Sequence, residues 1–431
     1  MEIQLPALDY SHTPAVNKDI RLNDEIMIHP RAAISNNINT ISFDIPKSTQ
    51  WIDINTLYAA VDVKLGYYKD NVWTNIKAAA ADAPQVSVVN NLLNSLFDLV
   101  EMRINGTNVS HKSGHHAFKS YLKTKCSFGP GAKQTWGQIC FNTEDSGEEG
   151  VNNAGFKERG IMFDDGKVVQ LVGLIDLDLC FVDNFIPSLM DITIQFHRAP
   201  HDFVVKNHTN DIDNAQLLIE SMKLFVKKPT LDPLIEKTLL NTLSEDCLTI
   251  AFERWELRQF SMPREIQKHT FGNLFGGTIP RKVIVGLVDS GAAVGDAKKN
   301  PFNFQHKNLR SIFFTKNGQR FPTQPLETDF ENKKTALAYY RTLRVLNYAN
   351  EDCNRILTHK EFQNGSTIMA FDLSVDNLDS EETGFRASDT GNLTLDVEFA
   401  ATLDEAMVVM VLGEFCGKIE ISKHRGVVCD F

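Results

Sequence analysis

The sequence lacks the features that mark several large classes of protein. Its seven cysteines are scattered, odd in number and without a Cys-x-x-Cys pair, which favours free thiols in a reducing compartment over a disulfide framework. No apolar run approaches the roughly 18 residues of a membrane span, and the N-terminus has no basic stretch followed by an apolar core. We therefore expect synthesis in the cytoplasm without a signal peptide or a transmembrane segment.

Concentrated positive charge is also missing. The net charge is −11, and neither half of the 431 residues carries a run of lysine and arginine. Proteins that bind nucleic acid directly usually present such a basic surface, because they must neutralise phosphates. Direct nucleic-acid binding is therefore not predicted.

Histidine pairs offer little support for a metal site. His197 and His201 are four residues apart, the spacing that lets two imidazoles share a zinc ion on a helix, but Pro200 lies between them and strand-like residues precede them. The adjacent His115 and His116 are likewise not predicted to bind a metal ion. We expect no metal ion and no cofactor.

Catalytic motifs are similarly scarce. The glycines at 291 and 295 are too close together for a phosphate-binding loop, and no Lys-Ser/Thr pair follows them. Asp176 and Asp178 share one face of an expected strand, and Glu253 and Glu256 form a second acidic pair of the kind glycosidases use. Because acidic residues are common on the wet face of a strand, we predict no catalytic residues and no enzyme.

What the chain does contain is a repeat. Asn105-Gly106 and Asn317-Gly318 each follow a short apolar strand, and Asn-Gly suits the tight turn of a β-hairpin because both residues tolerate a positive φ. Further segments match in the same order: a helical one at 117–122 and 336–343, and strands at 174–179 and 369–374, 190–196 and 393–399, 217–226 and 407–412. A duplicated β-sandwich explains these matches with one event.

The repeat divides the chain into two units. Residues 1–38 contain several prolines and asparagines without a sustained period and are expected to form an extended arm. The first sandwich is expected at 39–228 and the second at 244–431. A linker helix is predicted at 229–243, where Asp232 can cap the helix and Pro233 suits its first turn. Two long connections, 129–163 and 375–391, are candidates for exposed loops.

Several segments carry a family resemblance. They read Pro-Arg-Lys-Val-Ile-Val-Gly-Leu-Val-Asp at 280–289, Lys-Asn-Pro-Phe-Asn-Phe at 299–304, Asn-Gly-Gln at 317–319, Phe-Asp-Leu at 371–373, and Asn-Asn-Leu-Leu at 90–93 with Leu-Phe at 96–97. From about residue 41 to 423 the chain resembles the double jelly-roll major capsid proteins of DNA viruses. Several of these segments look closer still to the capsid proteins of Polinton/Maverick elements and adintoviruses.

The resemblance implies an all-β fold of two tandem eight-stranded jelly rolls, with a few short helices in the connections. It also implies a homotrimeric capsomer of pseudo-hexagonal outline, which tiles the icosahedral shell of a virion. The expected partners are further copies of the chain and a penton or minor capsid protein, and contact with a membrane is left open.

Two alternatives belong to other classes. A two-domain β-sandwich glycan hydrolase would need a cleft with paired carboxylates of perturbed pKa, for which only the two acidic pairs above qualify. A minor capsid protein, or a domesticated descendant of a capsid protein, is the other alternative. A vertex protein is expected to have one jelly roll, so the duplication argues against it.

Overall fold

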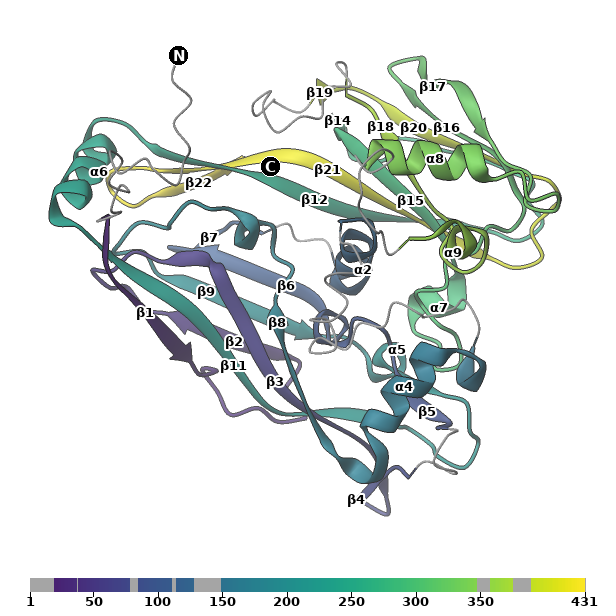
Figure 1. Ribbon diagram of the computed structural model, residues 1–431, viewed down its shortest axis with the longest axis horizontal. Helices are drawn as coiled ribbons and strands as arrows, with labels where there is room; N and C mark the ends of the chain where they lie inside the picture. Colours follow the sequence, from purple (N-terminus) through teal and green to yellow (C-terminus); the bar gives the residue numbers. More distant parts are fainter. Residues whose placement is uncertain are drawn as a thin grey trace, which may run out of the picture.

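The computed structural model describes residues 19–36, 38–77, 84–110, 114–127, 149–346, 357–374 and 389–430. Within these residues the chain forms two β-sandwiches, joined by helix α6 (Pro233–Glu245) and packed side by side (Figure 1). Each sandwich consists of two main sheets, named here A and B in the first sandwich and C and D in the second.

Sheet A has the order β1-β11-β3, and β8 and the short β4 both pair with β3, whereas sheet B has the order β2-β9-β6-β7. A further pair, β5 with β10, lies beside them. The strands are β1 (Ile20–Ile28), β2 (Thr40–Ile45), β3 (Asp53–Lys69), β4 (Val72–Asn75), β5 (Val86–Val88), β6 (Phe97–Ile104), β7 (Thr107–Asn108), β8 (Val168–Leu174), β9 (Ile192–Arg198), β10 (Val205–Asn207) and β11 (Gln216–Leu231).

Sheet C has the order β12-β21-β15-β18, with β22 added to β21, and sheet D has the order β13-β20-β16-β17. Strands β14 and β19 form a separate pair. The strands are β12 (Leu248–Met262), β13 (Lys268–Phe271), β14 (Thr278–Ile279), β15 (Lys282–Asp289), β16 (Leu309–Lys316), β17 (Gln319–Glu327), β18 (Ile368–Asp372), β19 (Asp389–Thr390), β20 (Leu393–Phe399), β21 (Met407–Ile421) and β22 (Val427–Asp430).

The two sandwiches repeat one topology. Taken in chain order, the strands of the second sandwich occupy the same sheet positions as those of the first. The corresponding pairs are β1 and β12, β11 and β21, β3 and β15, β8 and β18, β2 and β13, β9 and β20, β6 and β16, and β7 and β17. Eight strands in two four-stranded layers form a jelly roll, so the predicted double jelly roll is confirmed.

The two Asn-Gly turns have the same backbone conformation. Asn105 and Gly106 have φ values of 47° and 81°, and Asn317 and Gly318 have 48° and 84°. A type I′ turn requires a positive φ at both central residues, which explains why the same dipeptide stands between β6 and β7 and between β16 and β17.

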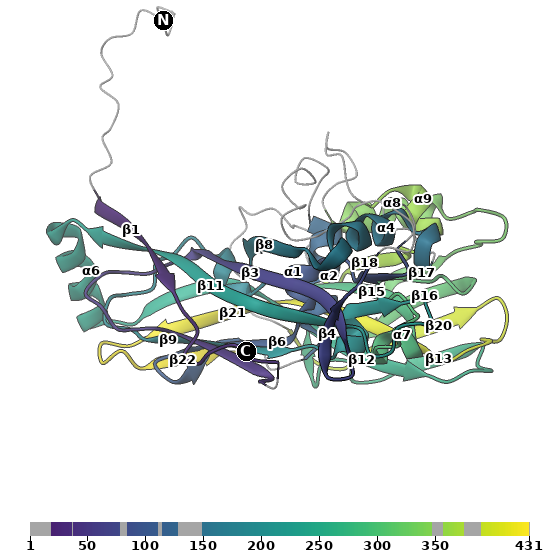
Figure 2. The same ribbon diagram turned by 90° about the horizontal axis from the view of Figure 1, so that it is seen from below.

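Helices occupy the connections, as expected. They are α1 (Leu92–Ser95), α2 (His116–Ser127), α4 (Ala154–Met162), α5 (His201–Val204), α6, α7 (Ser290–Val294), α8 (Ala336–Val345) and α9 (His359–Gln363), with 3-10 turns η4 (Gly150–Asn152), η5 (Asp164–Gly166) and η6 (Asp178–Phe181). Helix α6 begins as predicted, because the Asp232 carboxylate accepts a hydrogen bond from Leu234 N and Pro233 is the first helical residue. Figure 2 shows α2, α4, α8 and α9 along one side of the molecule.

Two expectations about local structure are wrong. The expected arm contains β1, which pairs with β11 from Ile20 to Ile28. Most of β1 is exposed, so its sequence lacks the alternation that marks a half-buried strand. The strand expected at 174–179 ends at Leu174, because the chain then leaves sheet A and turns into η6. The remainder of the expected arm before residue 19, and most of the two long connections, lie outside the described residues.

Sheet C is the most deeply buried layer of the fold. In β15, Val283, Val285 and Leu287 point into the core of the second jelly roll, whereas Ile284 and Val288 belong to the same apolar cluster as the core of the first roll. A sheet that is covered on both faces has a continuous hydrophobic sequence, as the β15 and β21 segments do.

The close packing on sheet C gives a first prediction. A Cβ at Gly286 of β15 would overlap the ring of Phe304, whereas a Cβ at Gly272 would meet nothing within 4 Å. We expect Gly286→Ala to lower the free energy of unfolding by about 1–3 kcal/mol, the usual cost of overpacking a core. Gly272→Ala is the matched control and should leave it unchanged or slightly higher. Chemical denaturation measures both, and equal effects would contradict this packing.

Candidate functional site: the seam between the jelly rolls

The seam is the contact of helix α2 and its neighbours in the first jelly roll with sheet C and its loops in the second. Aromatic rings fill its centre. The rings of Tyr121 on α2 and Phe302 stack with centroids 4.2 Å apart and planes 3° apart, and Phe118 meets Phe302 edge to face at 5.6 Å. Phe304 stacks on Tyr121 at 6.0 Å and lies over Gly286 of β15. These rings join the apolar core of the first roll to the outer face of sheet C.

Beside the aromatic rings lies a buried group of four charges. Lys123 Nζ is 2.6 Å from Asp176 Oδ1 and 3.4 Å from Asp178 Oδ1, and Lys119 Nζ is 2.8 Å from Asp178 Oδ1. Asp178 Oδ2 accepts a hydrogen bond from the backbone N–H of Trp255 on β12, at 3.0 Å. The group therefore links the first roll to a strand of the second.

The pKa values in this group follow from burial and from the opposing charges. Burial alone would raise the pKa of Asp176, but Lys123, Lys119 and His116 outweigh it, and the pKa lies below its usual value. Burial alone would lower the pKa of Lys123, but Asp176 and Asp178 raise it above its usual value. Both groups are therefore held in their charged forms, as a structural ion pair requires.

Another buried lysine joins the two rolls at the far end of α2. Lys125 is almost fully buried, and its Nζ lies 3.0 Å from Glu361 Oε1 on α9. Glu361 also closes the capping box of α9 with Thr358. The start of α9 is thereby fixed to the first roll.

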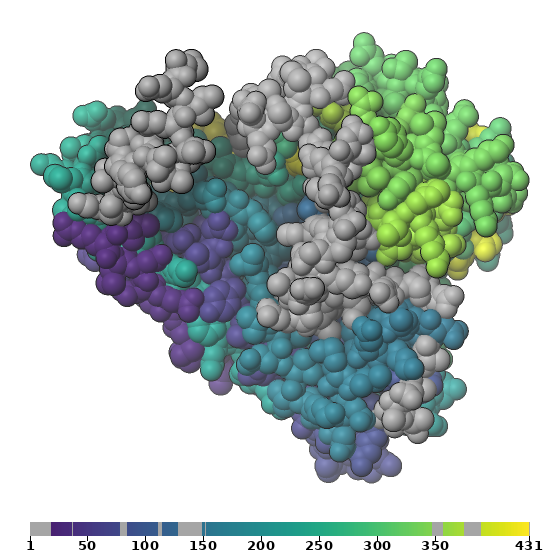
Figure 3. All heavy atoms as spheres, viewed as in Figure 1, coloured from purple at the N-terminus to yellow at the C-terminus, as the bar shows by residue number. Residues whose placement is uncertain are grey.

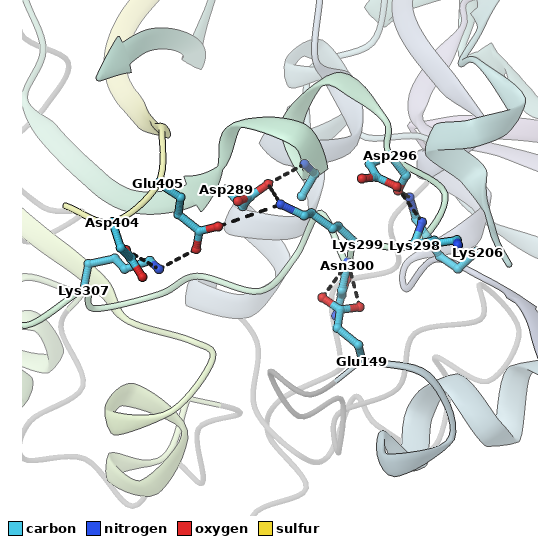
Figure 4. Close-up of polar contacts among 11 residues, drawn as sticks. Glu149, Lys206, Asp289, Asp296, Lys298, Lys299, Asn300, Lys307, Asp404 and Glu405 are labelled. Atoms are coloured by element: carbon cyan, nitrogen blue, oxygen red, sulfur yellow. Dashed lines mark hydrogen bonds and ion pairs between the residues drawn. The ribbon is translucent and has the colours of Figure 1, made fainter. Parts of the chain in front are cut away.

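A polar part of the seam follows α7 (Figure 4). Lys206 donates hydrogen bonds of 2.9 Å to the carbonyl oxygens of Asp202 in its own roll and Asp296 in the other. Burial lowers the pKa of Lys206 to about 8, although Glu149, Asp296 and Asp202 act in the opposite direction. The Glu149 carboxylate accepts a hydrogen bond from Asn300 N. The loop after α7 is thus bound to the first roll through its backbone.

A groove of about 530 Å³ lies next to these contacts, lined by both rolls. Its lining includes Asp202, Asn210, Asp213, Asn214 and Lys298. Pockets that bind small molecules are mostly apolar with a few converging polar groups, and this lining is the reverse. The groove has the character of a hydrated surface.

The structure places each of the acidic pairs in an ion-pair network. Asp176 and Asp178 line a cavity of about 20 Å³, which is room for one water molecule and not for a sugar ring. Glu256 is buried and pairs with Arg254 and Arg258, whereas Glu253 on the opposite face of β12 is exposed and pairs with Arg281. Neither pair flanks a cleft.

The glycine-rich segment does not form a phosphate cradle. It forms the short helix α7, capped by the Asp289 carboxylate, which accepts a hydrogen bond from Ala292 N. The nearby Lys299 pairs with Asp289 at 2.8 Å and approaches Glu405 to 3.9 Å, and Glu405 in turn contacts Lys307 (Figure 4). Two carboxylates therefore neutralise the charge of Lys299, which leaves it unsuited to binding a phosphate.

The histidines are also engaged separately. His197 on β9 lies 3.0 Å from Thr40 Oγ1, His201 begins α5, and the buried His116 contacts Asn94 while His115 is only partly buried. Within the described ranges, no three His, Cys, Asp or Glu side chains come together as a metal site would require.

None of the described helices has the length and apolarity needed to cross a membrane.

The sequence did not reveal the seam. Lys119 and Lys123 are four residues apart on α2 and Asp176 and Asp178 are two apart, which is a pattern of matching charges. This charge pattern could have been found only by comparing the helix with a segment about fifty residues further along the chain. Phe302 and Phe304 stand in a segment that was recognised by its family resemblance, without a predicted partner.

Comparison with known proteins identifies the class. The chain belongs to the double jelly roll-like domain family, whose sequence model matches residues 189–404, half of the chain. A curated protein of Caenorhabditis elegans, F54H12.2, is 22% identical over 291 residues, which are 66% of this chain and 68% of that protein.

Solved structures of viral capsids share the whole fold. The chain is similar along its full length to a chain of the Sputnik virophage, at 15% identity, 93% coverage of that chain and a TM-score of 0.63. It is similar in the same way to the mavirus major capsid protein, at 11% identity, 95% coverage and a TM-score of 0.55. The Faustovirus major capsid protein matches 95% of this chain and is covered to 92%, at 8% identity and a TM-score of 0.56.

The buried charges give a second prediction. Removing one partner of a buried ion pair leaves the other charge without compensation, which costs about 3–5 kcal/mol. We expect Asp178→Ala to lower the free energy of unfolding by about that amount, whereas Asp183→Ala, at an exposed carboxylate nearby, should change it by less than about 0.5 kcal/mol. Urea denaturation measures both. A small effect at Asp178 would show that the group does not hold the seam.

The same region gives a pH prediction. Burial, with Lys119 and Lys123, lowers the pKa of His116 to about 4, against the opposing effect of Asp176 and Asp178. The unfolded chain binds the proton near pH 6.5. The contribution of the neutral buried ring to the free energy of unfolding is therefore complete above that pH and is lost as the pH falls towards 4. That loss is about 3 kcal/mol, at 1.36 kcal/mol for each unit of pKa difference.

His116→Gln removes this titration. We expect the difference in unfolding free energy between the wild type and His116→Gln, measured in urea, to shift against the wild type by about 2–3 kcal/mol between pH 7 and pH 4.5. A constant difference between the two proteins at both pH values would show that His116 does not titrate with folding.

Proposed function

We propose that this chain is a major capsid protein, a non-enzymatic building block that assembles into homotrimeric capsomers of an icosahedral shell. The observation that carries the proposal is the seam. Two jelly rolls of the same topology are fixed side by side by a shared apolar core, and a rigid block of this kind is what a closed lattice needs. Three copies would present six similar sandwiches around one axis.

The sequence resemblance and the fold support a more specific proposal about the kind of virion to which the protein belongs. The segments at 280–289 and 299–304 resemble capsid proteins of Polinton/Maverick elements and adintoviruses, and the similar solved chains come from a virophage and from mavirus. We place the protein in the virion of such an element, with a penton or minor capsid protein as a second partner. The functional units are the two jelly rolls on either side of α6.

A glycan hydrolase receives less support. Its candidate carboxylates, Asp176 with Asp178 and Glu253 with Glu256, are bound to lysines and arginines rather than arranged around a substrate cleft. A minor capsid protein with two rolls would share the fold but would not form a homotrimer by itself, so the oligomeric state separates it from the main proposal.

The test is the mass of the purified protein in solution. We expect light scattering after size exclusion to give three times the chain mass of 48.5 kDa, and negative-stain images of the same peak to have a hexagonal outline. A monomer that persists at high protein concentration would contradict the capsomer proposal.

A further inference from the structure

The outer face of sheet A carries an apolar row that nothing in the described chain covers. Met27 on β1 is paired with Phe225 on β11, which is paired with Tyr58 on β3, which is paired with Leu174 on β8. The Tyr58 and Phe225 rings are stacked 4.9 Å apart, and Met27 and Leu174 are 48% and 45% exposed. A row of large apolar side chains across four strands is a typical mark of an interaction surface.

The corresponding row of sheet C is fully buried. Leu257 on β12 is paired with Leu412 on β21, then Ile284 on β15 and Ala370 on β18. All four are at most 3% exposed and belong to the apolar cluster that contains the core of the first jelly roll. The same face of the same sheet is therefore covered in one jelly roll and open in the other.

The helix surface that covers sheet C also has a counterpart in the second jelly roll. Helix α2 buries Phe118 and Tyr121 against the loop that lies on sheet C. Helix α8 stands in the same connection of the second roll, and alignment of Ala117 with Ala336 puts Leu337 and Tyr340 at the positions of Phe118 and Tyr121. Helix α8 packs on its own roll through Ala338 and Thr342, which are buried.

Leu337 and Tyr340 are 60% and 47% exposed and three residues apart, so they lie on one face of α8. That face and the sheet A row lie far apart in the molecule. Figure 3 shows β1 at the left edge, in purple, and the atoms of α8 at the upper right, in light green. A single chain cannot bring the two surfaces together.

We propose that the outer face of sheet A is the docking surface for the α8 face of a second copy of this chain. The contact is head to tail, because α8 of one copy meets sheet A of the next copy. It repeats the arrangement of the seam, in which a helix surface of the first roll covers the outer face of sheet C. Repetition of such a contact builds a ring when the rotation closes. The inference rests on the proposed capsomer and assigns the surfaces that join its copies.

Cross-linking between two variants tests the pairing. Leu174→Cys and Leu337→Cys are made separately in a Cys247→Ser background, because Cys247 is exposed. The two proteins are mixed, dissociated and reassembled, and then treated with a short bismaleimide. We expect covalent dimers in the mixture, joined between residues 174 and 337 in peptide mass spectra. Each variant alone should give at least five-fold fewer dimers.

Three outcomes are informative. Dimers of Leu174→Cys alone would indicate a two-fold contact and overturn the proposal. The absence of cross-links in a mixture that light scattering shows to be trimeric would also overturn it, while the capsomer function would stand. A mixture that stays monomeric would reject the capsomer function itself.

Surface variants give an independent measurement. Leu174→Asp and Leu337→Asp should each raise the protein concentration at half-assembly by at least ten-fold, because each places a charge in the apolar contact. Val294→Asp is the matched control, since Val294 is 81% exposed on α7 and belongs to neither surface. Unchanged melting temperatures would show that folding is intact. Equal effects of all three variants would contradict the docking surface.

Discussion

The burial of the outer face of sheet C against the first jelly roll is the constraint on which the rest of this structure depends. An isolated jelly roll needs only its inner faces covered, and its outer faces can meet water. Here Ile284, Leu412 and Ala370 are apolar on the outer face, and exposing them to water would be costly. The second roll therefore requires the first, because the apolar cluster of the first roll extends over the outer face of sheet C, while the inner face of sheet C packs into a separate core.

This constraint explains why charges lie inside the seam. Helix α2 must approach sheet C closely while it is tied to its own roll, and the lysines on its other face cannot reach water. Asp176 and Asp178 supply the compensating charges, and the second of them also accepts the Trp255 N–H. Ion pairs of this kind add little net stability but fix one arrangement, since any displacement leaves a buried charge unpaired.

Duplication predicted most of the fold. The two Asn-Gly turns, the helices after them, and the strands β9 and β20 follow from local chemistry that is repeated in both halves. Strand β1 was missed because an exposed edge strand has no alternating pattern. The 174–179 segment was misassigned because alternating acidic residues look the same on a wet strand and in a buried salt-bridge network. The seam depends on pairing between distant segments, which local patterns do not encode.

The two rolls have diverged in the outer faces of sheets A and C, one of which is exposed and the other buried. In the centre of sheet C, β15 and the first half of β21 are apolar on both faces, whereas the outer face of sheet A mixes Asp62, Lys64 and Lys223 with its apolar row. Sheet C is covered permanently within the chain, and sheet A remains accessible in the single copy. The same topology therefore supports one contact formed during folding and a second surface that stays available afterwards.

The central claim is that the two jelly rolls form one cooperative unit through the seam. Native-state hydrogen exchange at increasing denaturant tests it most directly, by comparing the amides of β11 in sheet A with those of β21 in sheet C. The account predicts that both sets converge on one opening free energy and exchange together. Two separate free energies, with one sheet opening while the other stays protected, would contradict it.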